Sequence, residues 1–593
     1  MILKPLPRVF SLLLLLPVRA LAARPSIVPI GQGKTNATVG AINSPLAITP
    51  PVPVATATAS GYFFAANATT SSAHPTHTSN ATLPACKSVQ YAFPSGTGGN
   101  ATRAAAVKEA YQYAFNAYVE YAWGYDELQP LSKTGTNDWY GWGVTVVDGL
   151  DTAIVMNLTD EVSKMLGWIQ TVDFTTTPDG DVEMFDITIR YLGGLLSSYD
   201  LLKSGQFYNG YDPDQIEALL TQAKTLADKL AYGFQTPTGI AAVDVDFSTN
   251  TPVEGTYTAS NGVTYNSTNT ASAGSFLLEW YRLAALTGNE TYRSLVDTGE
   301  YYLVHPNPSP TYPGLVGTQF DTTAGGMLNF AGGWHSEVDS FLEYLIKSYH
   351  YKADNITEEY ADFWLSAVKS TEAHIAVHPY GFDDLTFLSA MDTNGGLTYT
   401  MDDYSCFAGG NFLLGCKVLG MESLCDLGIA AADGCHQTYN TTTTGLGPLY
   451  WGWYDSDNTY PPDPTVDIDN GYRRNGAANG EFIVNGNEVY ASFPESLESW
   501  FYAYRITGDP RWAEYGWDMF LSLNETARNS VAFATVNNVG MPWGESQSNS
   551  LDSFFFAEVL KYMYLMFAEP DIVDLGKWVF NTECHPIQVQ CKA

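Results

Sequence analysis

WYRLAALTGNETYRSL (Trp280–Leu295) and WFYAYRITGDPRWAEY (Trp500–Tyr515) repeat one pattern. In each stretch an aromatic-rich helical segment runs into Thr-Gly-Asn or Thr-Gly-Asp, and a second helical segment follows. Repeated helix–turn–helix units are typical of stacked helical hairpins. These two stretches therefore predict a fold built from paired helices.

Further amphipathic helical patterns recur from about residue 101 onward, separated by loops rich in Gly, Pro, Asn and Asp. Over a chain of 593 residues, hairpins that close into a toroid are favoured over an open solenoid. A toroid places loops at one end and a pocket on its axis. We therefore predict an all-α protein with its strongest helical patterns at 106–128, 184–202, 215–234, 275–288, 338–353, 496–523 and 553–568.

The first hundred residues differ from the rest of the chain. A basic start, a short Leu run and the small-residue site Ala20-Leu21-Ala22 predict a signal peptide over 1–22. Residues 23–100 are rich in Thr, Ala, Ser, Pro and Gly, which predicts a disordered, glycosylated low-complexity leader. The domain organisation expected is thus 1–22, 23–100 and a helical domain over 101–593.

The composition excludes some classes of function. A formal net charge of −35 argues against nucleic acid, because phosphates require basic patches. The Leu run is too short to span a membrane, and no other segment is long and apolar enough. Aromatic content of 14% favours sugar binding weakly, since most aromatic residues lie in cores. We expect a soluble monomer of the secretory pathway, secreted or in the ER or Golgi lumen, without stable membrane insertion.

Glycosylation sequons and cysteines agree with that compartment. Most cysteines should form disulfide bonds in an oxidising compartment, and the odd total of 7 leaves at least one unpaired. Cys584 and Cys591 are close enough to staple the C-terminus, but spacing alone does not fix connectivity. The Asn-x-Ser/Thr sequons begin at Asn36, Asn67, Asn80, Asn100, Asn157, Asn266, Asn289, Asn355, Asn440 and Asn524.

Charged pairs interrupt three of the mostly apolar helical patterns. Asp186 and Arg190 share one helical face, which indicates either a structural ion pair or a catalytic carboxylate at the floor of a pocket. Two acid pairs, Asp339 with Glu343 and Glu495 with Glu498, also share faces. Like charges at this spacing repel, so each pair either lies at a solvated helix start or serves a site. Taken one pair at a time, the solvated helix start is favoured.

The ordered motifs of the chain resemble those of class I α-1,2-mannosidases, glycoside hydrolase family 47, of the fungal secretory type. The resemblance covers about residues 105–588. It rests on YAWGYDELQPLS at Tyr121, WGVTVVDGLDTAIVMNL at Trp142, MFDITIRYLGGLLSSYDL at Met184, GSFLLEWYRLAALTG at Gly274, VDSFLEYLIKSY at Val338, CFAGGNFLLG at Cys406, PESLESWFYAYRITGD at Pro494, SFFFAEVLKYMYLMF at Ser553 and WVFNTECHP at Trp578.

The resemblance implies an (α/α)7 barrel, one bound Ca²⁺, and inverting hydrolysis of terminal α-1,2-linked mannose from high-mannose N-glycans. Inversion requires an acid and a base on opposite faces of the sugar, with carboxyl groups roughly 6.5–9.5 Å apart to admit a water. Carboxylates carried by different helices of one pocket would meet this requirement.

The resemblance also implies residue roles. Asp186 matches the proposed general acid, and Asp339 and Glu495 match the two other catalytic carboxylates, both candidates for water activation. Thr582 matches the residue that gives its carbonyl and hydroxyl to calcium, and Cys406 and Cys435 match a core disulfide. The substrate-binding set comprises Arg190, Glu279, Glu498, Phe554, Glu558 and Glu583, of which the four acids also line the water shell of the calcium and Phe554 stacks on the scissile mannose.

Four positions depart from the family pattern. Asp186 replaces a glutamate, which bears on rate. Phe493 replaces the Arg of the usual Arg-Pro-Glu, Glu337 stands where some members have Arg, and Asp403 stands where His is common. These three positions bear on the choice of glycan branch.

Three functions are compatible with the sequence. The first is an active, calcium-dependent α-1,2-mannosidase. The alternative is a lectin-like or quality-control relative that binds high-mannose glycans with little turnover, which the departures at Asp186 and Phe493 motivate. The third is a toroidal glycosidase that acts on plant or fungal polysaccharide, against which the ordered motifs argue.

Overall fold

The computed structural model describes residues 85–178, 180–380, 382–453 and 488–591, together with the backbone at 483–484. The predicted signal peptide and nearly all of the predicted leader lie outside the described residues. The description below concerns the helical unit formed by the described residues from 85 onward.

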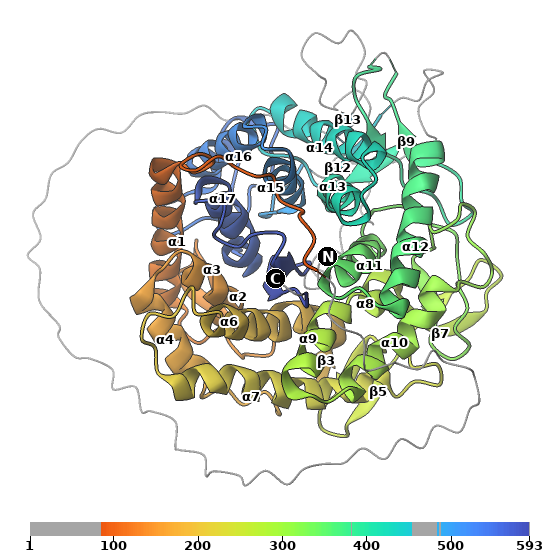
Figure 1. The fold of residues 1–593 in the computed structure, drawn as a ribbon, viewed down its shortest axis with the longest axis horizontal. Helices are drawn as coiled ribbons and strands as arrows, with labels where there is room; N and C mark the ends of the chain where they lie inside the picture. The colour runs from red at the N-terminus through yellow and green to blue at the C-terminus, as the bar shows by residue number, and fades with distance from the viewer. Residues whose placement is uncertain (1–84, 179, 381, 454–482, 485–487, 592–593) are drawn as a thin grey trace, which may run out of the picture. The chain divides into compact units, whose positions relative to one another are not determined.

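Helices dominate this unit, and Figure 1 shows them in an outer and an inner layer. The outer helices are α1 (Ala101–Tyr121), α4 (Thr159–Ile169), α7 (Pro213–Leu230), α10 (Thr291–Val304), α12 (Asn355–Ser370), α14 (Ser423–Thr441) and α16 (Arg511–Ser522). The inner helices are α3 (Leu150–Val155), α6 (Gly193–Lys203), α9 (Leu277–Thr287), α11 (Asp339–Tyr351), α13 (Ala408–Leu419), α15 (Glu495–Thr507) and α17 (Leu560–Phe567).

Burial follows the two layers. Every residue of α15 from Glu495 to Ile506 is buried, whereas α7 buries only one face. A helix that is buried all round belongs to the interior, and an amphipathic helix covers it. Inner and outer helices pack in pairs, as in α6 with α7, α11 with α12 and α13 with α14, and α1 packs against α17.

Both repeated stretches form the expected helix–turn–helix units. The first joins α9 to α10 and the second joins α15 to α16. The first helix of each unit, α9 or α15, ends at a glycine in the left-handed region. These are Gly288, with φ of 69°, and Gly508, with φ of 72°. A side chain at that φ would be strained, so glycine allows the chain to reverse there.

Short elements complete the fold. Helical turns are α2 (Val144–Asp148), α5 (Met184–Asp186), α8 (Thr270–Gly274), the π-helical η2 (Ile187–Leu192), η4 (Thr371–Ile375), η6 (Leu523–Ala527) and η8 (Phe555–Val559), and the 3-10 turns η3 (Ala231–Phe234), η5 (Asp403–Phe407) and η7 (Pro542–Gly544). The strands are β1 (Glu127–Gln129), β2 (Thr134–Thr136), β3 (Asp181–Glu183), β4 (Asp244–Asp246), β5 (Thr251–Val253), β6 (Gly255–Thr258), β7 (Thr264–Asn269), β8 (Gln319–Asp321), β9 (Ala376–Val377), β10 (Phe387–Leu388), β11 (Thr400–Asp402), β12 (Tyr450–Gly452), β13 (Ile483–Val484), β14 (Trp578–Phe580) and β15 (Pro586–Gln588).

These strands pair antiparallel in small sheets, so the fold is mostly helical rather than purely so. The hairpin β14–β15 matters most for function. In Figure 1 the dark blue segment after α17, to which this hairpin belongs, lies among the inner helices. The turn of the hairpin carries Asn581 to His585, which are thereby brought among side chains of the inner helices.

Residues 85–100, expected as the end of the leader, pack against the helical unit. Val89 is buried, and the backbone N–H of Tyr91 donates to the carbonyl of Arg505 at 2.7 Å. A disulfide joins Cys86 to Cys591 across a sequence separation of 505 residues. The biased composition of this segment therefore does not prevent it from being anchored.

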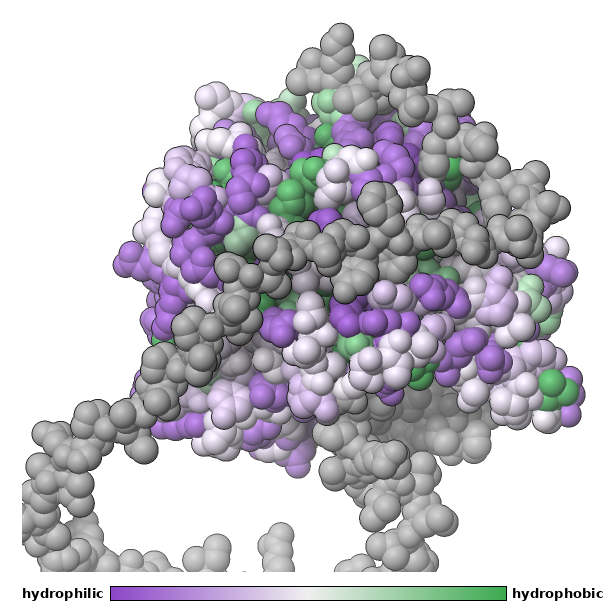
Figure 2. Space-filling model, turned by 90° about the horizontal axis from the view of Figure 1, so that it is seen from below, coloured by the Kyte–Doolittle hydropathy of each residue, from purple (hydrophilic) through white to green (hydrophobic). Residues whose placement is uncertain are grey.

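The surface seen in Figure 2 alternates hydrophilic residues with smaller hydrophobic groups. Most large aromatic side chains are instead interior, among them Trp280, Trp364 and Trp500. In the described part of the chain, no helix is long and apolar enough to cross a membrane.

Candidate active site

Arg190 contacts three carboxylates of a buried charged cluster in the interior of the helical unit. It lies in the π-helical turn η2, between α5 and α6. Its Nε donates to Asp186 Oδ1 at 3.0 Å, and its Nη2 lies 3.2 Å from Glu583 Oε1. A third carboxylate, that of Asp148, lies 3.7 Å from Nη1. Three buried acids around one guanidinium make this far more than a local helix pair.

Two aromatic rings cover the Arg190 guanidinium. Trp139 and Phe554 place their ring centroids 5.0 and 5.2 Å from its central carbon. Phe554 is buried at the start of the segment that leads into η8. The rings hold the guanidinium plane by cation–π contact, so Arg190 has little freedom to move away from Asp186.

Asp186 is 2% exposed and lies at the end of the short helix α5. Glu183 caps that helix, because its carboxylate accepts hydrogen bonds from the backbone N–H groups of Phe185 and Asp186. Burial and the neighbouring Asp186 charge raise the pKa of Glu183 well above its usual range. Glu183 was not among the residues singled out from the sequence, and its position three residues before Asp186 is the signal that could have found it.

Glu279 lies on α9 beside the hairpin turn. Its Oε1 accepts from Tyr344 Oη at 2.8 Å and from Asn581 Nδ2 at 2.7 Å. Tyr344 Oη in turn lies 3.3 Å from the backbone nitrogen of Thr582. Burial raises the pKa of Glu279 to about 8, against the hydrogen bonds that lower it. The structure therefore brings Thr582, Glu279 and Glu583 to one edge of the cluster.

Asp339 and Glu495 begin two different inner helices, α11 and α15. Both are buried, at 2% and 7% exposure, so the favoured expectation of solvated helix starts is wrong. Among the described residues, neither carboxylate oxygen of Glu495 has a hydrogen-bond partner. Burial, followed by the charge of Asp403, raises the pKa of Glu495 well above its usual range. A buried carboxylate with a raised pKa is a candidate general base.

The second acid of each of those pairs is buried as well. Lys347 forms ion pairs with both Glu343 and Glu498, the latter at 3.1 Å. The shared lysine compensates two carboxylates that would otherwise repel one another. Even so, burial raises the pKa of Glu498 to about 8, against the lowering effect of Lys347.

A second cluster lies behind Arg190. His585 Nδ1 is 2.7 Å from Asp151 Oδ2, and its Nε2 is 3.0 Å from Asp148 Oδ1. Lys561 pairs with the same Asp151 at 2.7 Å. Burial alone would lower the pKa of His585, but the two aspartates raise it to about 9. These residues lie in the motifs at Trp142, Ser553 and Trp578, but the sequence predicted no role for them.

The donor set of the hairpin region fits a calcium ion. Thr582 is half-buried at the hairpin turn and offers a hydroxyl and a carbonyl oxygen. Within the described residues, Glu279 Oε2 and Glu558 Oε1 are buried without hydrogen-bond partners. Burial and the charge of Glu583 raise the pKa of Glu558 well above its usual range. Ca²⁺ and its bound waters prefer hard oxygen ligands, and carboxylate oxygens without other partners are available to bind them.

Two of the four departures, Phe493 and Asp403, lie at the start of α15, and a third, Glu337, lies just before α11. Phe493 is buried against Tyr404 and Tyr490. Asp403 is also buried and accepts hydrogen bonds from Ser496 and Tyr439. Glu337 is half-buried and has a φ of 75°. Phe493 and Asp403 are thus packed into the interior, and their bearing on the choice of glycan branch stays a prediction.

The structure forms a disulfide between Cys406 and Cys435, the pair that the resemblance implied. Cys416 pairs with Cys425. Cys584 is free and buried, so the suggested staple between Cys584 and Cys591 is wrong. The reason is topological: the hairpin holds Cys584 in the interior, while Cys591 meets the segment that precedes α1.

Comparison with known proteins gives one consistent result. Residues 110–589 match the family described as glycosyl hydrolase family 47. A probable mannosyl-oligosaccharide α-1,2-mannosidase 1B of Aspergillus clavatus is 39% identical over 82% of this chain and 93% of its own length. A mannosyl-oligosaccharide α-1,2-mannosidase of Penicillium citrinum is 39% identical over 83% and 92%. The solved α-1,2-mannosidase from Trichoderma reesei matches with a TM-score of 0.77 at 38% identity, over 83% of this chain and 99% of that chain.

Proposed function

This chain belongs to glycosyl hydrolase family 47. We propose which of its buried acids carries out each step in the removal of mannose. It is a mannosyl-oligosaccharide α-1,2-mannosidase that acts on N-glycans. The observation that supports a catalytic role for the cluster is the concentration of buried, incompletely compensated carboxylates on different inner helices. Such groups are costly to fold and are retained where charge must develop during a reaction.

Asp186 is the proton donor in this proposal. Its carboxylate is buried and fixed by the Nε of Arg190, so it has a defined orientation. It donates a proton, directly or through a water, to the oxygen of the leaving sugar. Arg190 then balances the negative charge left on Asp186, and its second contact with Glu583 keeps it in place.

Asp339 and Glu495 activate the attacking water. They begin two helices other than α5, and attack from the face of the sugar opposite Asp186 would require such separate positions. Glu495, with both oxygens unpartnered in the described residues, is the stronger base candidate. A separated acid and base lead to inversion at the anomeric carbon.

Substrate contacts come from the remaining predicted residues. Phe554, held over Arg190, offers a ring face to the C–H side of the terminal mannose. Glu279, Glu498, Glu558 and Glu583 would accept hydrogen bonds from sugar hydroxyl groups or from waters bound to a calcium ion. A bound Ca²⁺ would supply a hard positive charge that orders sugar hydroxyls, and Thr582 would hold it.

The finer fold and location belong to the same proposal. The alternation of outer and inner helices and the packing of α1 against α17 support an (α/α)7 barrel. Disulfide bonds, the signal-like N-terminus and the sequons support an enzyme of the secretory pathway. We further propose that it acts as a monomer on high-mannose glycoproteins.

The test is digestion of a labelled Man₉ glycan with and without a calcium chelator, followed by mapping of the products. Release of mannose with inverted configuration, lost on chelation and restored by calcium, is the expected result. Tight glycan binding without release would favour the lectin-like alternative. Release that persists after complete calcium removal would contradict the metal assignment while leaving the hydrolase assignment intact.

A further inference from the structure

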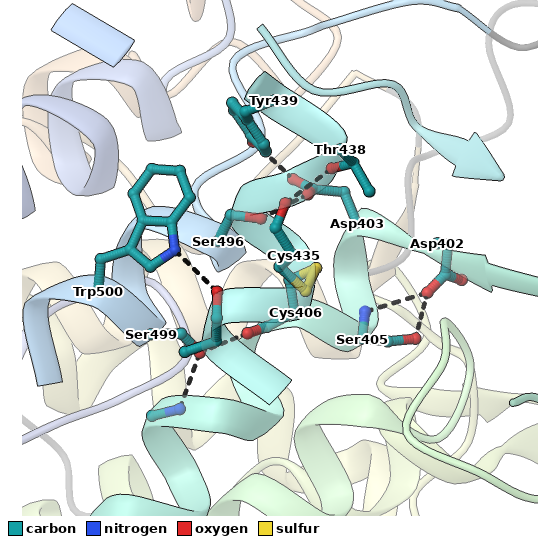
Figure 3. The surroundings of a disulfide bond; sticks show 12 residues. Asp402, Asp403, Ser405, Cys406, Cys435, Thr438, Tyr439, Ser496, Ser499 and Trp500 are labelled. Carbon is teal, nitrogen blue, oxygen red and sulfur yellow. Dashed lines mark hydrogen bonds between the residues drawn. A yellow bond between two sulfur atoms is a disulfide. The ribbon is translucent and has the colours of Figure 1, made fainter. Parts of the chain in front are cut away.

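Asp403 is a buried carboxylate outside the set of residues with a proposed catalytic role. It begins η5, directly after β11, and is 1% exposed. Its two carboxylate oxygens accept hydrogen bonds from two different helices. Oδ1 accepts from Ser496 Oγ of α15 at 2.8 Å, and Oδ2 accepts from Tyr439 Oη of α14 at 3.2 Å. Figure 3 shows the carboxylate between these two side chains.

Ser496 is the residue that directly follows Glu495 in the first turn of α15. A hydrogen bond to Ser496 therefore fixes the backbone from which the Glu495 side chain projects. In the described part of the chain, Asp403 takes part in no ion pair, so its negative charge is not neutralised by a lysine or arginine. Among the neighbouring charges, that of Asp403 contributes most to raising the pKa of Glu495.

The frame around Asp403 is rigid. The disulfide Cys406–Cys435 ties η5 to α14. Ser499, on α15, donates to the carbonyl of Cys406 and accepts from the backbone N–H of Gly410. Trp500 adds a hydrogen bond to the carbonyl of Ala432 at 3.2 Å. Figure 3 shows these links converging on the start of α15, so the separation of Asp403 and Glu495 is set by covalent and hydrogen-bonded connections.

We propose that Asp403 is a positioning residue for Glu495: it holds the first turn of α15 through Ser496 and places a second negative charge beside the Glu495 carboxylate. This inference rests on the proposed role of Glu495 as the base. The two carboxylates form a pair in which the charge on one makes the other a stronger base. A stronger base abstracts a proton from water more readily, as long as the pH is high enough to keep it ionised.

The titration of the pair supports this reading. Burial raises the pKa of Asp403 to about 7, against the hydrogen bonds from Ser496 and Tyr439 that lower it. The loss of two protons from such a pair occurs in two steps that belong to the pair rather than to either residue. Other titratable groups act on the same two carboxylates, namely Asp402, Tyr439 and Tyr490 on Asp403, and Asp339, Glu558 and Tyr404 around Glu495.

The experiment is the pH profile of kcat/KM for Asp403→Asn in the full-length, calcium-loaded protein with an α-1,2-linked mannose substrate. Asparagine keeps the shape and an acceptor for Ser496 but removes the charge. The acid limb, which reports ionisation of the base, should move to lower pH by about one unit, and the maximum rate should fall because the remaining base is weaker. An acid limb identical to that of the wild type would overturn the proposal.

Two further variants cover the case in which Asp403→Asn fails to fold. Tyr439→Phe removes one hydrogen bond that stabilises the charged form of Asp403, so the acid limb should move in the same direction by a smaller amount. Thr438→Ala is the matched control, since this neighbouring buried hydroxyl donates to the carbonyl of Cys435 and not to Asp403. The control should change stability without moving the limb, and equal shifts in the two variants would contradict the proposal.

Glu495→Gln separates this inference from the proposed function. Inactive Glu495→Gln with an unmoved limb in Asp403→Asn refutes the role of Asp403 alone. Retained activity in Glu495→Gln refutes the base assignment on which it rests.

Discussion

Asp186 carries the shorter acid of the family pattern, and its surroundings are complete. The carboxylate is buried and bound to Arg190. Arg190 is held in turn by Glu583, Trp139 and Phe554. A decayed site would be expected to lose such supporting contacts. The retained contacts support our proposal that this is a working site built around the shorter side chain.

Asp186→Asn should lower kcat by about 10²–10⁴-fold, the usual contribution of general acid catalysis, while sugar binding survives. The amide oxygen keeps the hydrogen bond from Arg190 but has no proton to give. Asp186→Glu should also lower kcat, because Asp186 is only 2% exposed and the additional methylene group must fit into closely packed surroundings. The measurement is steady-state kinetics with glycan binding by calorimetry.

Asp200→Asn is the matched control. Asp200, on α6, forms a comparable buried ion pair with Arg282 of α9 at 2.6 Å. The Asp200→Asn change should cost stability and leave kcat near that of the wild type. Full activity of Asp186→Asn on a natural glycan would remove Asp186 from the mechanism, and a gain of activity in Asp186→Glu would identify a decayed site.

His585 links stability to pH. Its folded-state pKa of about 9 lies above its ordinary value of 6.5, because Asp151 and Asp148 favour the charged ring despite burial. The stabilisation is therefore fully present below about pH 6.5 and is lost as the pH rises through about 9. The loss should be on the order of 3 kcal/mol of unfolding free energy.

Chemical unfolding of wild type and His585→Gln at several pH values between 6 and 9.5, in saturating calcium, checks this prediction. The difference in unfolding free energy between the two proteins should shrink as pH rises. A difference that stays constant over the whole range would show that the proton on His585 does not stabilise the fold.

At the scale of elements, the hairpin β14–β15 brings the turn that holds Thr582 against Glu279 and Tyr344. Asn581 Nδ2 also donates to the carbonyl of Ile189, which precedes Arg190. One turn thus contacts both the proposed metal region and the π-helical segment η2 that carries Arg190. Irregular helical turns of this type are frequent at functional sites.

Thr582→Ala should weaken calcium binding, because it removes one of two oxygens that the residue can offer. Ligand linkage then predicts a smaller rise of Tm on addition of calcium. The readout is thermal unfolding across a calcium titration, with Thr442→Ala as the control. Thr442 donates to the carbonyl of Leu446 away from the hairpin, so its variant should keep the full calcium-dependent rise. A wild-type calcium response in Thr582→Ala would contradict the assignment.

At the scale of the whole molecule, covalent links join segments that are remote in sequence. The Cys86–Cys591 disulfide spans 505 residues, whereas Cys416–Cys425 spans 9. Arg505 adds non-covalent links, since it donates to Gln90 before α1 and to the carbonyl of Pro570 after α17. The segment before α1 and the segment after α17 are therefore fastened to the same helix, α15.

The double variant Cys86→Ser/Cys591→Ser should lose about 2–5 kcal/mol of stability, because a link across a long loop restricts the unfolded chain most. Cys416→Ser/Cys425→Ser should lose less. Guanidinium unfolding of both variants beside the wild type measures the difference. Equal losses would indicate that native-state contacts, rather than loop length, set the contribution of each bond.

The sequence by itself determined the features that depend on neighbours along the chain. Helical periodicity and a Thr-Gly turn predicted the hairpins at α9–α10 and α15–α16, because both signals act over a few residues. The ordered motifs identified the family and selected Asp186, Asp339 and Glu495 as candidates. The roles of these acids stay predictions until the variants above are measured.

Only the tertiary structure decided which charges are buried and what compensates them. Asp339 and Glu495 read as solvated helix starts in isolation, and the inner layer buries both. Lys347 reaches Glu498 from a helix 151 residues away in sequence, and Arg190 reaches Glu583 across 393. The pairing of Cys86 with Cys591 has the same origin. Burial, Coulomb interaction and disulfide geometry all depend on groups from other helices, and no local pattern carries that information.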